Sequence, residues 1–144
     1  MMIVRLVAVL TAGLFSGAAI YINLVEHPAR MSCGTGLAVK QWRPSYHRAT
    51  IMQVPLAIVS LLSSLAVWYF DHVRLFLVSG LLIGSVIPFT LLVILPTNKK
   101  LEQPGIENDV DQTSQLLARW NHLHLVRTIL SLCSFAVMLF AILK

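Results

Sequence analysis

The sequence predicts an all-α integral membrane protein, an antiparallel (up-down-up-down) four-helix bundle with long first and third loops on the same face. Of its 144 residues, 57% are hydrophobic and 12% are charged, and the mean hydropathy is +0.78, which is too apolar for a soluble domain of this size. Four apolar segments, at residues 3–25, 46–70, 75–95 and 111–143, are long enough to cross a bilayer. A short turn at 71–74 makes the middle two antiparallel. We therefore expect residues 1–144 to form a single transmembrane domain.

The charges and cysteines exclude several other classes of protein. The net charge of +5 is spread between apolar segments, whereas a nucleic-acid-binding domain needs a basic stripe on a folded surface. We therefore expect no nucleic-acid partner, and expect the lipid bilayer to be the main one. Cys33 and Cys133 should lie too far apart for a disulfide. The N-terminus resembles a signal peptide, but its apolar run is too long for one, so we expect it to be retained.

The first hairpin is expected to join segments 3–25 and 46–70 through a loop at about 31–43. Gly13 and Gly17 form a small-xxx-small pattern that lets a neighbouring helix approach closely. Trp42 suits the membrane–water interface, and Pro44 suits the first position of the second helix.

The second hairpin is expected to join segments 75–95 and 111–143 through a polar loop at about 99–109. Gly80 and Gly84 repeat the small-xxx-small pattern. Either Asn108 or Asp109 is a suitable N-cap for the last helix. That helix is longer than the hydrocarbon layer is thick, so its first turns should project from the membrane.

Polar side chains recur at i, i+4 and i+7 near the same end of three segments, a spacing that places them on one helix face. Such groups are costly against lipid, so they should line a shared cavity. The three stripes are Asn23, His27 and Arg30; Tyr46, Thr50 and Gln53; and Trp120, His124 and Arg127; Thr97 and Asn98 end the third segment at the same level.

The basic residues are distributed unevenly between the two ends of the expected bundle. Eight of the 11 Lys and Arg residues fall at the end with the polar stripes. The positive-inside rule then places this end and both long loops in the cytoplasm, with the termini on the opposite side.

Several short motifs occur in an order that is more specific than any one of them. They are Gly13-Leu14-Phe15-Ser16-Gly17, His27-Pro28-Ala29-Arg30, Trp42 ahead of Tyr46, Pro88-Phe89-Thr90, Pro96-Thr97-Asn98, and Trp120 with His124 and Arg127. In this the chain resembles a family of small four-span membrane proteins, mostly of unknown function, that includes the fungal anthrone oxygenases. The resemblance covers nearly the whole chain. It implies oxygenation of a reduced polycyclic aromatic to a quinone, without a well-established cofactor.

The residues themselves favour chemistry that combines a base with hydrogen-bond donors. We expect His27 and His124 to be catalytic, because a neutral imidazole can remove an acidic C–H or O–H proton from a lipophilic anthrone- or phenol-like substrate. Donors near the base could then stabilise the resulting oxyanion. The expected substrate-binding residues are Asn23, Arg30, Tyr46, Gln53, Asn98, Trp120 and Arg127.

Two alternatives remain open at this point. The first is a protein that binds haem or a metal through His27 and His124; the main expectation is no cofactor and no metal. The second is a non-catalytic membrane subunit that binds a small molecule or has a structural role. The sequence also leaves open whether the chain forms a homo-oligomer.

Overall fold

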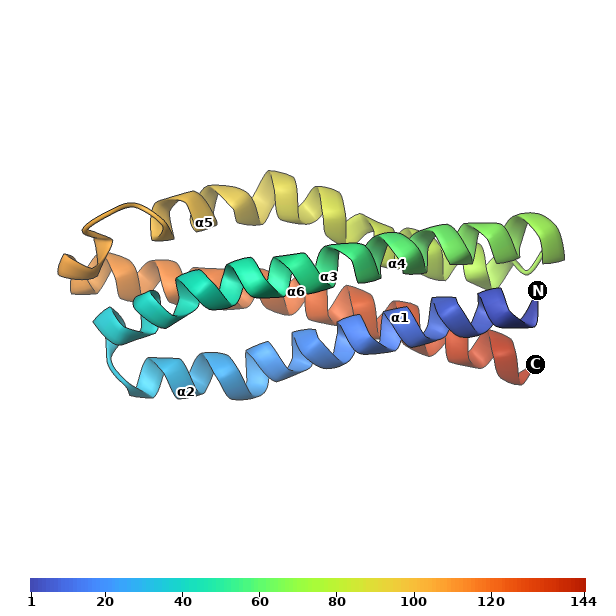
Figure 1. Ribbon diagram of the computed structural model, residues 1–144, viewed down its shortest axis with the longest axis horizontal. Coiled ribbons are helices and arrows are strands. Elements are labelled where there is room, and N and C mark those ends of the chain that lie inside the picture. Colours follow the sequence, from blue (N-terminus) through green and yellow to red (C-terminus); the bar gives the residue numbers. More distant parts are fainter.

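The computed structural model describes residues 1–144 as four long helical spans that run alternately up and down (Figure 1). The spans cover Met2–Ser32, Thr35–Asp71, Arg74–Leu101 and Val110–Leu143. Each is long and apolar enough to cross a bilayer, and large apolar side chains are exposed along all four. The predicted antiparallel four-helix bundle is confirmed, and the protein is a multi-pass membrane protein.

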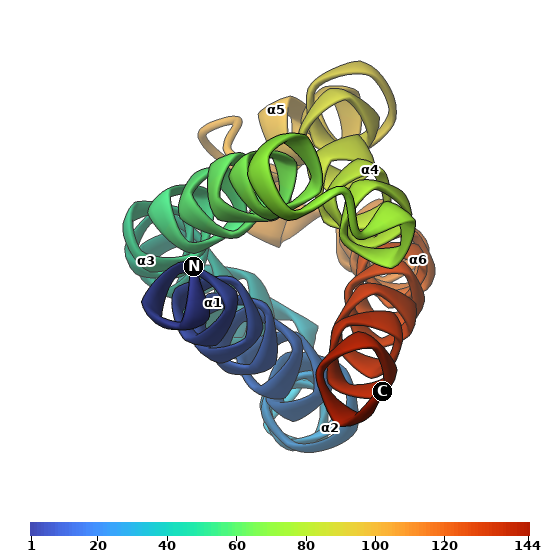
Figure 2. The ribbon, with the colours of Figure 1, turned by 90° about the vertical axis from the view of Figure 1, so that its right-hand side faces the viewer.

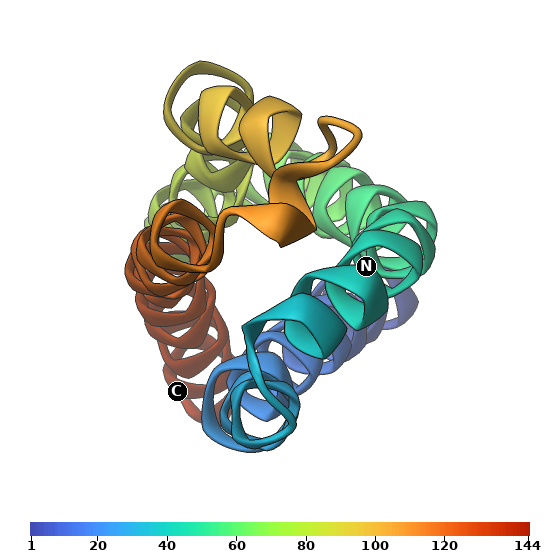
Figure 3. The same ribbon diagram turned by 90° about the vertical axis from the view of Figure 1, so that its left-hand side faces the viewer.

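The spans are arranged in a square in which α1, α3, α4 and α6 each pack on two neighbours (Figures 2 and 3). Both termini and the α3–α4 turn lie at one end, and the other two connections lie at the opposite end (Figure 1). In chain order the elements are α1 (Met2–Tyr21), the π-helical turn η1 (Ile22–Glu26), α2 (His27–Ser32), α3 (Thr35–Asp71), α4 (Arg74–Phe89), the π-helical turn η2 (Thr90–Ile94), α5 (Leu95–Leu101), the 3₁₀ turn η3 (Ile106–Asn108) and α6 (Val110–Leu143).

The two π-helical turns have the same local cause. Each ends two residues before a proline, η1 before Pro28 and η2 before Pro96. Proline lacks an N–H, and its ring collides with the carbonyl four residues earlier in a regular helix. A wider turn relieves this collision without ending the helix, and such turns are frequent at functional sites. Both turns lie in the half of the bundle that holds the buried His, Arg, Asn and Gln side chains.

The first connection is shorter than the sequence suggested. A loop was expected over residues 31–43, but α3 begins at Thr35, and Gly34 makes the bend with a φ of 89°. Pro44 is consequently inside the helix rather than at its start. Trp42 is fully buried among protein side chains rather than exposed to lipid headgroups, since it packs with Leu101 and Trp120 in an apolar cluster that closes this end of the bundle. This packing stabilises the additional turns of α3 beyond the apolar segment.

The third connection is a true loop that is fastened to α3. Arg43 donates hydrogen bonds to the carbonyls of Leu101 and Gln103 and forms an ion pair with Glu107 at 3.1 Å. The backbone amide of Glu107 and the neighbouring Arg43 hold the pKa of the Glu107 carboxyl below its usual value. Asp109 accepts a hydrogen bond from the Gln112 amide at 3.0 Å, so it is the N-cap of α6.

The close approach between α3 and α4 depends on Gly80, which has no side chain. A Cβ on Gly80 would lie 3.0 Å from the Ser64 Cβ, whereas a Cβ on Gly17 would contact nothing within 4 Å. Gly80→Leu is therefore expected to lower the free energy of unfolding by about 1–3 kcal/mol, because the two helices must separate. Gly17→Leu is the matched control and should change it by no more than about 0.5 kcal/mol. Unfolding in mixed detergent measures both, and equal effects would contradict this view of α3–α4 packing.

Candidate functional site

A small polar chamber lies inside the bundle at the end with the two connections. Its volume is about 20 Å³, which is enough for one molecule the size of water. Residues from η1, α2, α3 and α6 form its wall, so it depends on three of the four spans. Its lining residues are Ile22, Arg30, Ser45, Tyr46, Ala49, Thr50, Gln53, Trp120, His124 and Arg127.

Asn23 is buried and joins η1 to α6 through a set of hydrogen bonds. Its Nδ2 donates to the backbone carbonyl and the Oδ1 of Asn121, at 3.1 and 2.8 Å. Its Oδ1 accepts from the Thr128 hydroxyl at 2.6 Å and lies 3.0 Å from Nδ1 of His124. These contacts fix the orientation of the amide, because the reversed amide would direct its oxygen at the Asn121 carbonyl, which cannot donate.

The orientation of Asn23 also fixes the tautomer of His124. Since Oδ1 of Asn23 can only accept, Nδ1 of a neutral His124 must carry the ring proton. Nε2 then keeps its lone pair, and the His124 side chain lines the polar chamber. A neutral imidazole held in this way is able to accept a proton from a molecule in the chamber.

The two arginines of the chamber differ in how their charge is balanced. Arg30 forms an ion pair with Glu26 at 2.5 Å, and Glu26 also accepts hydrogen bonds from Ser45 and Gln41. Arg127 forms no ion pair within 4.0 Å; it donates to Oε1 of Gln53 at 2.9 Å, and its guanidinium carbon lies 5.5 Å from the centre of the Phe15 ring. Arg127 therefore contributes a cation that no carboxylate of the protein neutralises.

Buried polar atoms without a partner are concentrated at this end of the bundle. Nine such side-chain atoms have no hydrogen-bond partner within the protein, and seven of them are N–H donors. A buried donor that is left unpaired costs about 1–3 kcal/mol. The site is therefore rich in donors and poor in acceptors. The seven donors are Arg30 Nε and Nη1, Trp42 Nε1, Gln53 Nε2, Asn98 Nδ2, Trp120 Nε1 and Arg127 Nε.

The ring of Trp120 lies at the centre of the aromatic and basic groups. The ring centres of His124, Trp42 and His27 lie 5.0, 5.8 and 5.9 Å from it. The guanidinium carbon of Arg30 lies 5.8 Å from the same ring, which is a cation–π distance. Trp120 and His124 both line the chamber, whereas His27, on the same aromatic cluster, does not.

A second, larger cavity of about 250 Å³ adjoins the polar chamber. Both cavities are lined by Tyr46, Thr50, Gln53 and Arg127. The remaining lining of the larger cavity is mainly apolar and comes from α1, α3, α4, η2 and α5. The donor-rich chamber therefore lies at the inner end of a space that suits an apolar molecule.

Comparison with known proteins identifies the family of the chain. The sequence profile of the family described as anthrone oxygenase matches residues 42–137. The chain belongs to the anthrone oxygenase family. The matched residues include Gln53, Trp120, His124 and Arg127 of the chamber.

Curated anthrone oxygenases are similar over most of the chain. Anthrone oxygenase dmxR16 of Cryptosporiopsis sp. (strain 8999) is 26% identical over 132 residues, which cover 87% of this chain and 77% of the relative. Anthrone oxygenase AgnL2 of Paecilomyces divaricatus is 28% identical over 146 residues, covering 87% and 86%. Anthrone oxygenase ptaC of Pestalotiopsis fici is 28% identical over 116 residues, covering 69% and 81%. No solved structure matches the chain.

The structure of this anthrone oxygenase family member separates the site residues expected from the sequence into two groups. Asn23 accepts a hydrogen bond from Nδ1 of His124, His27 is buried against Trp120, and Asn98 is buried with neither amide atom hydrogen-bonded. None of these three lines either cavity. Those that do line the chamber are Arg30, Tyr46, Gln53, Trp120, His124 and Arg127.

Four residues of the site were not expected from the sequence. Thr128 lies four residues after His124, so helical spacing could have suggested its contact with Asn23. Asn121 and Ser45 gave no such signal, because their roles depend on contacts between different spans. Phe15 lies in an apolar run, and only the structure brings its ring beneath Arg127.

Proposed function

We propose that the protein is a membrane-embedded oxygenase that acts on a lipophilic aromatic of the anthrone or phenol class. The observation that supports this most directly is the excess of unpaired buried donors on residues that line the chamber, among them Arg127, a cation without a carboxylate partner. A ligand that completes this site must bring acceptors and negative charge. An enolate or phenolate oxygen on an apolar ring system supplies both, and the adjoining cavity would hold the rings.

The proposed reaction begins with proton removal by Nε2 of His124. The substrate C–H or O–H bond breaks, its electron pair remains on the ring system, and the negative charge is spread onto the substrate oxygen beside Arg127 and Gln53. The electron-rich anion reduces dioxygen and a carbon–oxygen bond forms, and the resulting peroxide anion takes the proton back from Nε2 of His124 to become a hydroperoxide. Loss of water then yields the quinone, so that one oxygen atom of O₂ is retained and the other leaves as water. Dioxygen is the only oxidant that this scheme needs.

Asn23 is proposed to be a positioning residue for His124. Asn23→Leu should free the imidazole to adopt the tautomer with the proton on Nε2, which cannot act as the base. The turnover number kcat is expected to fall about 10-fold or more with little change in KM. Nitrogen-15 NMR of labelled histidine should show the His124 proton moving from Nδ1 to Nε2. A loss of activity with an unchanged tautomer would contradict the positioning role.

We propose that no haem or metal takes part. A haem held between His27 and His124 does not fit this arrangement, because both rings pack against Trp120, His27 lines neither cavity, and the chamber at His124 has a volume of only about 20 Å³. No three His, Cys, Asp or Glu side chains are close enough to hold a metal ion. The alternative role of the two histidines as ligands of haem or a metal is therefore less well supported than a role as base for His124 and as a packed ring for His27.

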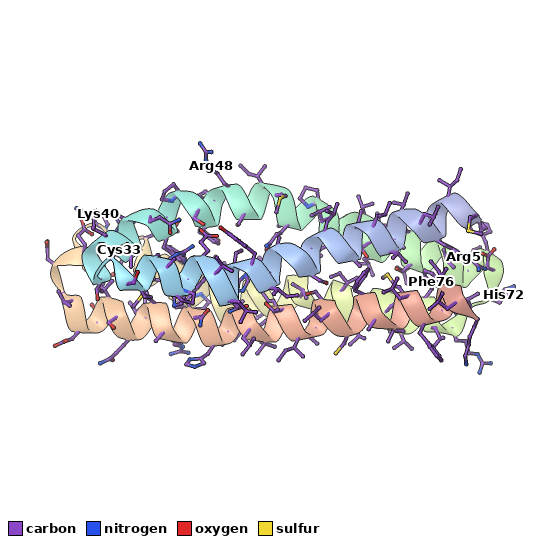
Figure 4. All side chains as sticks on the ribbon, turned by 90° about the horizontal axis from the view of Figure 1, so that it is seen from below. Arg5, Cys33, Lys40, Arg48, His72 and Phe76 are labelled. Atoms are coloured by element: carbon purple, nitrogen blue, oxygen red, sulfur yellow. The ribbon has the colours of Figure 1, made fainter.

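We propose that the site end of the bundle faces the cytoplasm. Lys40 and Arg48 lie toward that end, and Arg5 and His72 lie at the opposite end (Figure 4). Eight of the 11 Lys and Arg residues belong to the site half. The bilayer is the proposed partner, with anionic headgroups bound to exposed bases such as Lys40, Lys99 and Lys100.

The test is turnover of 9-anthrone by the purified protein in lipid nanodiscs. We expect formation of anthraquinone with consumption of one O₂ per product and retention of one ¹⁸O atom from ¹⁸O₂. Metal analysis and the absorption spectrum of the active sample report any metal or haem. If anthraquinone formed no faster than in empty nanodiscs, the proposal that the protein is an oxygenase would be contradicted. If the protein then still bound a hydroxyanthraquinone, the alternative of a non-catalytic binding subunit would be supported instead.

A further inference from the structure

The cavity of about 250 Å³ lies where the third span departs from the second. The elements η2 and α5 pack against α6 and diverge from α3 at the site end of the bundle (Figure 1). The π-helical turn before Pro96 is the local feature that accompanies this departure. The cavity is lined from both sides of the gap, by Val54 and Ala57 of α3 and by Leu91 of η2.

The lining changes in character from the outside to the inside. Val54 and Leu91 are exposed on the outer surface of the bundle, whereas Ala57 and Phe15 are buried. The inner end is Arg127 with Gln53, the wall shared with the polar chamber. A molecule in this cavity would therefore meet mainly apolar groups along its length, with the cation of Arg127 and the amide of Gln53 at the end shared with the chamber.

The outer end of the cavity opens at the level of the hydrocarbon layer. Val54 is close to the middle of α3, about 28 Å from its start and about 26 Å from its end at 1.5 Å per residue. The neighbouring Ile51 is 76% exposed, and Leu92, next to Leu91, is 77% exposed. Side chains of this kind face acyl chains rather than water in a multi-pass membrane protein. The opening therefore faces lipid.

We propose that the gap between α3 and η2 is a lateral entrance through which a flat aromatic molecule passes from the bilayer, oxygen end first, with Val54 and Leu91 setting its width. The identity of this occupant rests on the proposed function. The volume of the cavity, about 250 Å³, is just below the range of typical small-molecule pockets, which is about 300–1,000 Å³. A phospholipid fits less well, because its polar group stays at the membrane surface while the donors of this cavity lie inside the bundle.

The two residues at the entrance each have a neighbour that makes a matched control. Val54→Phe and Leu91→Phe enlarge side chains that line the cavity, whereas Ile51→Phe and Leu92→Phe enlarge exposed side chains that do not line it. All four positions are exposed, so the substitutions should leave the fold intact. Val54→Ala and Leu91→Ala provide the opposite change, a wider entrance.

The experiment measures the association rate of 1-hydroxyanthraquinone with the full chain in nanodiscs, from quenching of tryptophan fluorescence. We expect the rate to fall about 10-fold in Val54→Phe and Leu91→Phe, to rise in the two alanine variants, and to stay within about twofold of wild type in the two controls. Equal rates in the entrance and control variants would overturn the lateral entrance and leave the proposed function intact. Binding with these rates but without turnover of 9-anthrone would support the entrance and contradict the oxygenase. A copurifying acyl chain that the probe does not displace would overturn the entrance, with lipid as the occupant.

Discussion

His124→Asn is expected to lower kcat for anthrone oxidation by about 10²–10⁴-fold, the usual contribution of general base catalysis. Asparagine is chosen because its amide nitrogen can occupy the place of Nδ1 and continue to donate to Asn23, while nothing replaces Nε2. The hydrogen bonds of Asn23 to Asn121 and Thr128 should persist. Binding of 1-hydroxyanthraquinone is therefore expected to change by less than threefold. Steady-state kinetics and equilibrium binding separate the two effects.

Two other histidines serve as controls for His124→Asn. His122 is exposed on a different face of α6, so His122→Asn should leave kcat unchanged. His27 is buried but lines neither cavity, so His27→Asn is expected to act mainly through packing against Trp120 and to reduce kcat by less than 10-fold. A larger loss from His27→Asn than from His124→Asn would reverse our assignment of the base.

The sequence was sufficient for the fold because the fold depends on composition. Four apolar segments and the turn before Arg74 leave few arrangements other than an up-down-up-down bundle. The start of α3 was misplaced because hydropathy reports contact with lipid, whereas residues 35–43 are helical through contact with protein. Trp42 is the clearest case, since a tryptophan typical of the interface is fully buried in the end cluster.

The polar chamber lies at the end of the bundle where the sequence places the polar stripes, but the sequence does not show which of these residues line it. Regular helical spacing places Asn23, His27 and Arg30 on one face. Asn23 lies within the π-helical turn η1 and His27 directly follows it, and in such a turn residues four apart no longer lie above one another. No pattern in the sequence announces that turn except Pro28, which is also compatible with a kink or a helix end. Only the structure therefore shows that His124, and not His27, lines the chamber.

Arg127→Met is expected to separate function from stability. The guanidinium is the cation of the site without a carboxylate partner, and methionine fills similar volume over the Phe15 ring without charge. Removing a buried charge that is not paired should leave the free energy of unfolding unchanged or raise it. Affinity for the phenolate form of 1-hydroxyanthraquinone should fall by about 2–5 kcal/mol, the usual result of truncating one partner of a buried charge pair.

Arg119→Met is the matched control for Arg127→Met, because Arg119 is exposed and lies two turns earlier on α6. It should alter neither stability nor affinity by more than about 0.5 kcal/mol. Gln53→Leu combined with Arg127→Met removes the amide that Arg127→Met leaves unpaired, so the double variant should be more stable than the single one. If Arg127→Met and the double variant were both less stable than wild type, Arg127 would be a structural residue. A residue kept for binding an anion should instead destabilise the empty site, so that its removal raises the free energy of unfolding.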